Sequence, residues 1–521
     1  MTPTGFIITL PPPTPNGGLH VGHMSGPFLA GDVFARAARL QGQHSFVTCY
    51  SDINQSYVRV TAERQQRDPE TLYRYWTDDI IKTLKLYHID VADYFSPEEE
   101  AVTWVRDLFH QLYQRGVLVK KRFPFFYSEK EQIWHDEAGI SGYCPVCLAT
   151  CKCGICEACG NLTNAETIIK PRVTNSGSTE VTIRNAEVLV LELERFRQPI
   201  TQFYQQNKRF RQRYQWLAED ALSTTLPDFP VTMPGNWGIS MAHADFPGQV
   251  INAWPEIMAE LLYSYQRAIE RDPQLNDFPV PVNFFGFDNA YFYAVVHVAM
   301  LSQIDNGRWL PWATMINEFY NLDHAKFSTS NNHLVWASDL AQRCRVDAIR
   351  FYAAFNAPGF EKANFNETDM MRVLDNSLEK SWLNITAAWN QKVATCVTPL
   401  PPLSATWHQI GESARQRILA SYTLERFHLR QAAEDLLHLM KFIEMTLSQY
   451  HDAETLRGVG WLLQCFSQAA WPLMPQSSEK LFRLLTGIDQ MTLNTTDFLH
   501  LCDLPSSFFS TRISDPPEQR G

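Results

Sequence analysis

The sequence predicts an α/β Rossmann-like domain that is interrupted by a cysteine-rich insertion and followed by an α-helical bundle. Three observations support this fold class. A short apolar strand at residues 5–10 runs through a Pro- and Gly-rich loop into a helix at 20–40, as at the start of a doubly wound sheet. Six of the eleven cysteines fall within 144–159. Residues 376–486 carry a helical pattern almost throughout, typical of a bundle of four or five helices.

The alternation of strand and helix continues after the first helix, breaks, and then resumes. The pattern predicts a strand at 45–50 and amphipathic helices at 71–86 and 101–115. Later it predicts a helix at 250–268, a strand at 280–285 and a helix at 290–304. We therefore expect five segments, namely a first half-domain (1–115), an insertion (116–231), a second half-domain (232–370), a helical domain (371–490) and a loose tail (491–521).

Composition and charge narrow the class of protein. Hydrophobic residues make up 45% and charged residues 19% of the 521 residues, typical of a globular protein with large cores. The net charge of −11 argues against a generally basic nucleic-acid binder. The start of the sequence lacks the pattern of a signal peptide, and no apolar stretch reaches about 18–20 residues, so we expect a cytoplasmic protein without a membrane span.

Two motifs lie far apart in the sequence. Residues 15–23 read Pro-Asn-Gly-Gly-Leu-His-Val-Gly-His, and residues 326–330 read Lys-Phe-Ser-Thr-Ser. A strand that ends in a Gly-containing loop and opens a helix offers backbone N–H groups to a phosphate. His20 and His23 share a helix face, where ring N–H groups can stabilise charge on a phosphate under attack. Gly22 has no Cβ, so an adenine ring can lie against the backbone.

With these motifs the sequence resembles the class I methionyl-tRNA synthetases over roughly residues 5–490. The alternative is two polar histidines at a helix cap and a surface lysine. The resemblance implies ATP, Mg²⁺, and attack of an amino-acid carboxylate on the α-phosphate, giving an aminoacyl-adenylate and pyrophosphate. The residues to which it carries catalytic or ATP-binding roles are His20, His23, Lys326, Asn16, Gly22, Asp288, Ser328 and Ser330.

The sequence departs from the family at two positions near the triphosphate. Thr329 stands where the family has the second lysine of its Lys-Met-Ser-Lys-Ser loop, and Phe287 stands where it has a lysine before Asp288. Loss of one preorganised charge at a developing anion typically costs about 3–4 kcal/mol of barrier. Either adenylation is slow, or another cation such as Arg345 or Lys362 compensates.

The amino-acid pocket is also altered. By resemblance, Asp52 receives the substrate ammonium, a sound match for a buried carboxylate, and Trp254 lines the side-chain pocket. Thr14 and Asn289 put polar groups where the family has a tyrosine and an isoleucine. We therefore expect a substrate other than methionine, with compensated methionine specificity as the alternative. The remaining positions assigned to this pocket are Pro12 and Tyr293.

The cysteine cluster predicts a metal site. Cys144, Cys147, Cys156 and Cys159 form two Cys-x₂-Cys pairs, which supply four thiolates for one Zn²⁺. The resembling family has a zinc knuckle in the same insertion. Four protein thiolates leave no open position for water, so the zinc is expected to be structural. Cys151 and Cys153 lie between the pairs and stay open as alternative ligands.

The C-terminal bundle lacks most of what its counterpart in the resembling family uses to read an anticodon. Asn384 matches the family's asparagine, but the arginine position is Ala388 and no tryptophan stands near 447–449. Both energetic anchors for base contact and stacking are missing. Residues 371–521 hold 13 Lys+Arg against 15 Asp+Glu, an unpromising surface for a polyanion. Specific reading of tRNA(Met) is therefore not expected, and Trp382, Trp389 and Trp461 are expected in the core.

The leading hypothesis is an ATP-dependent amino-acid-activating enzyme that passes the acyl group to an acceptor other than tRNA. The chain is similar to the synthetase-like half of hydrazine-forming enzymes in natural-product pathways, which implies a separate cupin or carrier protein as a partner. One alternative is a genuine aminoacyl-tRNA synthetase with altered specificity. Another is a non-catalytic relative that binds nucleotide or amino acid.

Overall fold

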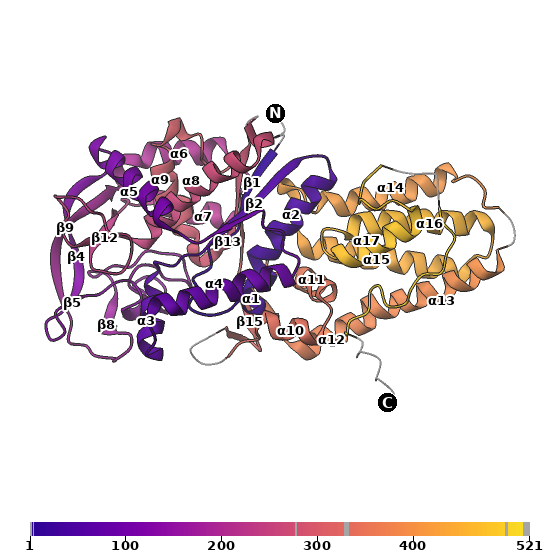
Figure 1. Ribbon diagram of the computed structural model, residues 1–521, viewed down its shortest axis with the longest axis horizontal. Coiled ribbons are helices and arrows are strands. Elements are labelled where there is room, and N and C mark those ends of the chain that lie inside the picture. The colour runs from indigo at the N-terminus through magenta and orange to yellow at the C-terminus, as the bar shows by residue number, and fades with distance from the viewer. Residues whose placement is uncertain are drawn as a thin grey trace. The chain divides into compact units, whose positions relative to one another are not determined.

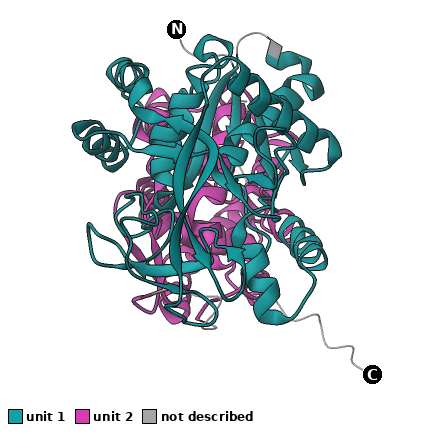
Figure 2. Cartoon of the chain, turned by 90° about the vertical axis from the view of Figure 1, so that its left-hand side faces the viewer, with its two compact units in different colours: residues 1–18, 46–82, 91–316 teal, residues 19–45, 83–90, 317–521 magenta. Residues whose placement is uncertain are grey.

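The structure is a computed structural model that describes residues 3, 5–276, 279–327, 333–396, 399–494 and 499–513. Figure 2 shows two compact units, each built from separate stretches of sequence. Unit 1 comprises residues 1–18, 46–82 and 91–316, and unit 2 comprises residues 19–45, 83–90 and 317–521. Because both units are discontinuous in sequence, the five consecutive segments expected above stay a prediction.

A five-stranded sheet forms the centre of unit 1 (Figure 1). Its order is β14-β13-β1-β2-β3, where β1 pairs in parallel with β13 and β2 pairs in parallel with β3. This is the doubly wound order, and the direction of chain progression reverses between β1 and β13, where such folds bind ligands. The strands are β1 (Gly5–Thr9), β2 (His44–Tyr50), β3 (Asp93–Phe95), β13 (Val280–Gly286) and β14 (Ala313–Asn317).

The expected insertion is rich in antiparallel strands. One sheet has the order β10-β9-β4-β5, with β4 and β9 paired along most of their length, and a second has the order β7-β6-β8. A two-stranded ribbon of β11 and β12 follows. The strands are β4 (Val119–Ser128), β5 (Ile133–Trp134), β6 (Ile140–Tyr143), β7 (Thr150–Lys152), β8 (Ile169–Val173), β9 (Thr182–Glu192), β10 (Asp228–Pro230), β11 (Thr232–Pro234) and β12 (Gln249–Ile251).

Amphipathic helices surround these sheets. The helix expected at 250–268 begins later than predicted, because residues 249–251 form β12 and Asn252 caps the helix by accepting from the backbone N–H of Trp254. The helix expected at 290–304 is a π-helical turn at Phe292–Val296 followed by a short α-helix. The helices are α3 (Ser56–Gln65), α4 (Pro69–Leu86), α5 (Glu99–Gln114), α6 (Arg197–Gln206), α7 (Gln212–Ser223), α8 (Ala253–Arg271) and α9 (His297–Leu301).

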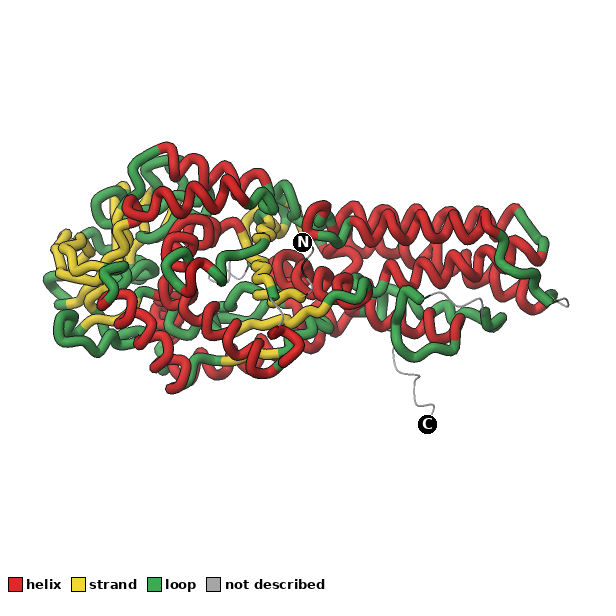
Figure 3. The backbone as a smooth tube through the Cα atoms, turned by 90° about the horizontal axis from the view of Figure 1, so that it is seen from above, coloured by secondary structure: helices red, strands yellow, loops and turns green. Residues whose placement is uncertain are grey.

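Unit 2 combines a small sheet of order β16-β15-β17 with helices, and five of these, α13 to α17, form the bundle (Figures 1 and 3). In the described part of the chain, every helix is too short or too polar to span a bilayer. The elements are α1 (Val21–His23), α2 (Leu29–Leu40), β15 (Tyr320–Leu322), β16 (Ala325–Lys326), α10 (Ala337–Arg343), α11 (Val346–Phe355), β17 (Ala363–Phe365), α12 (Glu367–Val373), α13 (Lys380–Thr395), α14 (Ala405–Ala420), α15 (Leu429–Gln449), α16 (Ala453–Ala470) and α17 (Pro475–Thr486).

The prediction of a single helix at 20–40 is wrong. It is divided into α1 and α2 by a π-helical turn at Met24–Phe28. Gly26 leaves helical geometry there (φ −99°, ψ −122°), and Pro27 lacks the N–H that a regular helix requires. The break lies directly after His23, so the first motif occupies a short turn of its own.

The loose tail expected at the C-terminus is also wrong for residues 499–513. The indole N–H of Trp382 donates to the carbonyl of Pro505 at 3.0 Å, and that of Trp389 donates to the carbonyl of Cys502 at 2.9 Å. Phe509 is buried. Trp382, Trp389 and Trp461 lie in the core, as expected. The two buried indoles of α13 obtain hydrogen-bond partners from this segment, which explains why a polar stretch packs.

Candidate active site

Asp52 follows directly after β2 at the carboxyl edge of the unit 1 sheet. Its backbone N–H donates to the carbonyl of Pro13 in the loop after β1 at 3.1 Å. The hydroxyl of Thr14 donates to Oδ2 of Asp52 at 3.3 Å, and the amide of Gln55 approaches the same oxygen at 3.5 Å. The loop that contains Pro12 therefore faces this carboxylate, and the Thr14 hydroxyl points at Asp52.

The Asp52 carboxylate is 5% exposed and, among the described residues, has no lysine or arginine as an ion-pair partner. Burial raises the pKa of Asp52 to about 7, although the hydrogen bonds from Thr14 and Gln55 lower it. A buried carboxylate without a counter-ion is costly. An ammonium placed against it would supply the missing charge.

Trp254 lies near the start of α8 and stacks on Phe292 with ring centroids 3.6 Å apart. Its indole N–H donates to Oε2 of Glu137 at 2.6 Å, and its backbone carbonyl accepts from Nε2–H of His297 at 3.0 Å. Tyr293, one residue after Phe292, is buried and its ring lies 4.6 Å from that of His297. Trp254 and Tyr293, both expected in the pocket, thus lie in one cluster of aromatic side chains within unit 1.

Sequence reasoning missed three carboxylates near this group, of which Glu256 and Glu260 are buried and Glu137 is half-buried. Glu256 and Glu260 lie one turn apart on α8, 2% and 0% exposed, and both oxygens of Glu260 lack a hydrogen-bond partner. Asn54 donates to Oε1 of Glu256 at 2.6 Å. Burial raises the pKa of both glutamates, and their mutual repulsion raises that of Glu260 further. The sequence signal for Glu256 and Glu260 was the presence of two acidic residues in an apolar helical stretch. No sequence pattern pointed to Glu137.

The residues of unit 1 that were expected to bind nucleotide lie at the switch point of the sheet. Asn16 is in the loop after β1, and its amide reaches Thr61 at 3.5 Å. Asp288 and Asn289 are in a turn directly after β13, where the Asn289 amide donates to Oδ1 of Asp288 at 3.4 Å. Because β1 and β13 are neighbours, the two loops emerge at the same edge of the sheet.

Phe287 stands where the resembling family has a lysine, and the side chain of an arginine packs against its ring. The guanidinium carbon of Arg213 lies 3.5 Å from the centroid of the Phe287 ring. Burial lowers the pKa of Arg213 from its usual value, but arginine stays charged at neutral pH. The chain therefore places a positive charge beside Phe287 by a route that the motif does not reveal.

In unit 2, His20 and His23 form a compact pair at the start of α1. Their ring centroids lie 3.8 Å apart. The backbone N–H of Gly22 donates to Nδ1 of His20 at 3.1 Å, and the backbone N–H of His20 donates to Nδ1 of His23 at 3.2 Å. Since both Nδ1 atoms are acceptors, the neutral rings carry their protons on Nε2 and present them as donors.

The histidine pair is uncharged at neutral pH. Burial, and then the neighbouring His23, lower the pKa of His20 well below its usual value. Desolvation by the surrounding protein atoms lowers the pKa of His23 to about 4, although the residue is partly accessible to solvent. Two neutral Nε2–H donors can therefore hydrogen-bond an anion without a change of protonation.

The second motif meets the first within unit 2. The Phe327 ring stacks on the His20 ring at 4.6 Å. A Cβ on Gly22 would lie 2.9 Å from Cε1 of His20 and 3.2 Å from the Phe327 ring, so glycine is required for this close packing. Lys326 pairs in β16 with Asn321 of β15. Ser328, Thr329 and Ser330 lie outside the described residues.

The two cations considered as substitutes for the missing lysine have other contacts. Nε of Arg345 donates to the carbonyl of Arg512 at 3.4 Å, and the ammonium of Lys362 lies 5.8 Å from the centroid of Phe319. Compensation by either residue stays a prediction.

Four cysteines converge in the insertion. Sγ of Cys144 lies 3.7 Å from that of Cys159, and Sγ of Cys147 lies 3.5 Å from that of Cys156. All four sulfurs lie within 4.8 Å of one another. A tetrahedral Zn²⁺ with bonds of about 2.3 Å separates its sulfurs by about 3.8 Å, so this donor set fits zinc.

The two alternative ligands lie outside this group. Burial raises the pKa of Cys151 to about 11 and that of Cys153 to about 12, so both are neutral thiols. Cys151 is buried in a small core with Ile140 and Ile168. The structure thus assembles the four outer cysteines as a candidate zinc site.

Asn384, the bundle residue that matches the resembling family, already donates a hydrogen bond within the bundle. The Asn384 amide donates to Oε1 of Glu444 at 2.9 Å, and the Lys441 ammonium lies 3.1 Å from the other oxygen of that carboxylate. An acidic side chain therefore borders the residue that would have to read a base. This arrangement adds negative charge where a polyanion would need positive charge.

Known proteins share the sequence pattern and the fold. The family described as "tRNA synthetases class I (M)" matches residues 6–388. A methionine–tRNA ligase of Roseiflexus castenholzii is 26% identical over 93% of this chain and 87% of that protein. The ligases of Methanobrevibacter smithii (25% identical) and Thermomicrobium roseum (26%) match 69% and 72% of this chain, which spans only 55% and 65% of their length.

Solved structures agree with this assignment at the level of fold. A Mycobacterium tuberculosis methionyl-tRNA synthetase bound by methionyl-adenylate superposes with a TM-score of 0.75 at 16% identity, over 97% of this chain and 100% of that chain. The expected class I synthetase fold is therefore confirmed. Because the family match extends over well more than half of the sequence, the chain belongs to the class I tRNA synthetases of type M.

Proposed function

We propose that this chain activates an amino acid with ATP. A carboxylate oxygen of the amino acid attacks the α-phosphorus, the bond from that phosphorus to the bridging oxygen breaks, and aminoacyl-adenylate and pyrophosphate form. The observation that carries the proposal is the assembly of His20, His23 and Phe327 from the two distant motifs in unit 2.

Each group has a role in this reaction. Asp52 would hold the substrate ammonium and so orient the carboxylate at the other end of the same small molecule. The Nε2–H groups of His20 and His23 would donate to oxygens of the phosphate as negative charge develops there. Mg²⁺, when bound with the triphosphate, would neutralise charge on the departing pyrophosphate. Asn16, Asp288 and Lys326 would position the nucleotide.

The amino acid that is activated is proposed to differ from methionine. The Thr14 hydroxyl serves Asp52, Asn289 serves Asp288, and Tyr293 fills the aromatic group beside Trp254. These contacts add polar atoms around a site that a thioether would require to be apolar.

The acyl acceptor is proposed to be a molecule other than tRNA, delivered with or by a separate protein such as a cupin or a carrier. Ala388 offers no base contact, Asn384 is bound to Glu444, and the segment 371–521 has more acidic than basic residues. These features support the loss of anticodon reading without any loss of the activation chemistry.

A second candidate function is a genuine aminoacyl-tRNA ligase with altered specificity. The match to the Roseiflexus castenholzii ligase favours it, because that similarity extends through the bundle as well as the catalytic region. Exchange of labelled pyrophosphate into ATP, run over all amino acids, tests activation. Charging of total tRNA with the best amino acid then separates the two functions. No exchange with any amino acid would leave a non-catalytic nucleotide-binding protein.

A further inference from the structure

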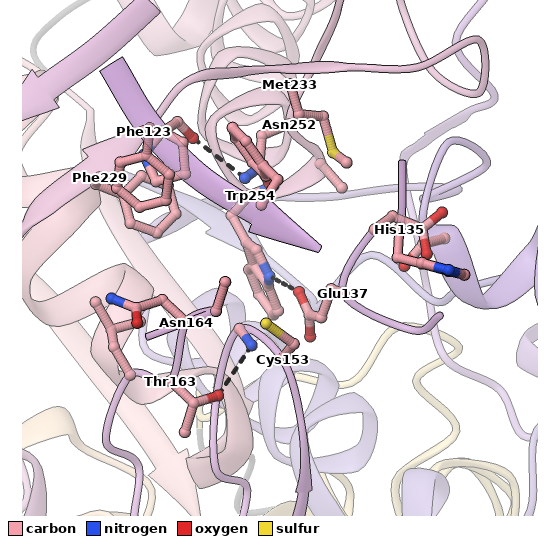
Figure 4. Close-up of a pocket in the computed structure, with 18 of the residues that line it drawn as sticks. Phe123, His135, Glu137, Cys153, Thr163, Asn164, Phe229, Met233, Asn252 and Trp254 are labelled. Carbon is pink, nitrogen blue, oxygen red and sulfur yellow. Dashed lines mark hydrogen bonds between the residues drawn. The ribbon is translucent and has the colours of Figure 1, made fainter. Parts of the chain in front are cut away.

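Unit 1 contains a cavity of about 120 Å³ between the inserted sheets and the start of α8. Its volume corresponds to about four water molecules, enough for a short aliphatic chain. Aromatic rings supply much of the wall, and Trp254 and Glu137 meet in its centre (Figure 4). The Phe and Trp residues in the lining are Phe123, Phe125, Phe126, Phe229, Trp237, Trp254 and Phe292.

Glu137 lies beside Trp254 in the middle of this cavity (Figure 4). The only hydrogen bond that the described structure gives its carboxylate is the one from the Trp254 indole at 2.6 Å. Gly154 allows the carboxylate to lie there, since a Cβ at that position would come within 2.7 Å of Cδ of Glu137. The half-buried side chain therefore lies against the Trp254 indole.

The two other acidic residues that line the cavity already have cationic partners. Asp136 pairs with Arg59 at 2.6 Å, and Asp228 pairs with Lys121 at 2.6 Å. No lysine or arginine stands among the described lining residues. Lys152 interacts electrostatically with Glu137. Its ammonium donates hydrogen bonds to the Thr174 hydroxyl at 2.9 Å and to the carbonyl of Ala138. Glu137 is thus the acid of this cavity that lacks a close counter-ion.

Two further buried carboxyl groups lie behind the cavity wall. Asn54 lines the cavity and donates to Glu256, whose second oxygen has no partner, and Glu260 follows one turn later. Burial raises the pKa of Glu137 to about 8, so this group is mostly protonated at neutral pH in the free protein. On the opposite side, Nε2 of His135 is buried without a partner and offers another polar contact.

We propose that this cavity binds an organic cation, an ammonium or guanidinium on an aliphatic chain, with Glu137 as its counter-ion and the rings of Trp254 and Phe292 as its walls. An alkyl stem suits the aromatic lining, and a cation over aromatic faces gains further attraction. Such a group has two possible sources under the proposed function, the side chain of the activated amino acid or an amine that accepts the acyl group.

Direct binding tests the cation without reference to catalysis. Titration calorimetry or Trp fluorescence on the full chain would compare lysine and arginine with norleucine, whose side chain is uncharged, and cadaverine with uncharged pentanol. We expect the cations to bind at least about tenfold more tightly, since a hydrogen bond to a charged group is worth that much. Equal affinity for charged and uncharged ligands would overturn the proposal.

Two variants locate the binding site. Glu137→Gln keeps an acceptor for the Trp254 indole but removes the charge, and we expect it to abolish the preference for cations. Asp228→Asn, at a lining carboxylate that Lys121 already neutralises, is the matched control and should bind cations as the unmodified protein does. Glu137→Lys would place an ammonium in the cavity and should exclude the ligand. Retained zinc content and melting temperature verify folding, and unchanged cation binding in Glu137→Gln would overturn the proposal.

Pyrophosphate exchange then identifies the source. Exchange stimulated by lysine or arginine, and reduced in Glu137→Gln, assigns the cavity to the side chain of the activated amino acid. Exchange with another amino acid, with the product captured on cadaverine or lysine, assigns it to the acceptor. If no amino acid supports exchange while the cation preference persists, the proposed activation fails and the cation site still stands.

Discussion

Two buried aspartates of this chain have opposite surroundings. Asp32 on α2, in unit 2, is 0% exposed and lies 2.7 Å from Nη2 of Arg350 and 2.9 Å from Nε of Arg36. Asp52, in unit 1, is 5% exposed and has only uncharged neighbours as hydrogen-bond donors. Burial by itself raises the pKa of both, but Arg36 and Arg350 bring that of Asp32 below its usual value, whereas that of Asp52 rises to about 7.

The difference indicates that the charge of Asp32 serves the fold, whereas the charge of Asp52 is available to a ligand. Arg350 also donates to the carbonyls of Leu473, Pro472 and Tyr87, so the Asp32 pair joins α2 and α11 to the bundle. Asp52 makes no comparable connection. A buried carboxylate that stabilises nothing in the free protein is explained if a cationic substrate completes it.

The largest effect is expected on stability at Asp32. Asp32→Asn leaves Arg350, which is 1% exposed, without its counter-ion, and loss of one partner of a buried pair costs about 3–5 kcal/mol. Urea denaturation followed by circular dichroism measures the change. Arg39→Gln is the matched control, because the Arg39–Asp90 pair is exposed and worth about 0–1 kcal/mol. Equal losses in both variants would remove the distinction.

At Asp52 the effect is expected on catalysis and not on stability. Asp52→Asn keeps a group that can bond Thr14 but cannot neutralise an ammonium, so kcat/KM for the amino acid in pyrophosphate exchange should fall by about 2–5 kcal/mol of transition-state binding. The free energy of unfolding should stay the same or rise, because a buried charge without a partner is removed. A destabilised variant with normal exchange would mean that Asp52 is structural.

The KM for the amino acid is expected to depend on pH through Asp52. With a pKa of about 7, the carboxylate must lose a proton before it can pair with the ammonium. Between pH 6 and pH 8 the ionised fraction rises about tenfold, so KM should fall about tenfold and then level off. Pyrophosphate exchange across this range measures it. The Asp52→Asn variant should lack the dependence, and a KM that rises with pH would contradict the assignment.

The same two aspartates should give stability opposite pH dependences. The folded-state pKa of Asp52 is raised, so its contribution is complete below about pH 4 and is lost as pH rises through about 7. The folded-state pKa of Asp32 is lowered, so its contribution is present above about pH 4 and is lost as pH falls through the folded value. Subtracting the stability profile of each Asn variant from that of the unmodified protein should yield slopes of opposite sign.

The sequence was sufficient for the fold because its signals are local. Apolar strands predicted β1, β2 and β13 within a residue or two, and the Cys-x₂-Cys spacing predicted which sulfurs converge. Where a local signal was overridden, a specific residue was responsible. Pro27 and Gly26 break the first helix, and the buried indoles of Trp382 and Trp389 bind a C-terminal stretch whose composition is that of a loop.

The site was predictable only where a motif names it. His20, His23 and Asp52 could be found by spacing and resemblance, but the tautomers of the histidines depend on backbone N–H groups that only the structure orients. Glu137 stands in an irregular stretch and gains its importance from Trp254, more than a hundred positions away. Its missing counter-ion is a property of the fold, and no sequence pattern records it.

The smallest effect is expected at Asn384, an exposed residue of the bundle. Asn384→Ala removes one hydrogen bond to Glu444 and should lower the free energy of unfolding by about 0.5–1.5 kcal/mol. Pyrophosphate exchange should not change, since none of the residues proposed for activation lies on α13. Transfer of the acyl group should also stay constant if the acceptor is a small amine, and this is measured by product formation from preformed adenylate. A loss of tRNA charging of about tenfold or more would instead restore Asn384 as a reader of bases and the bundle as an anticodon-binding domain.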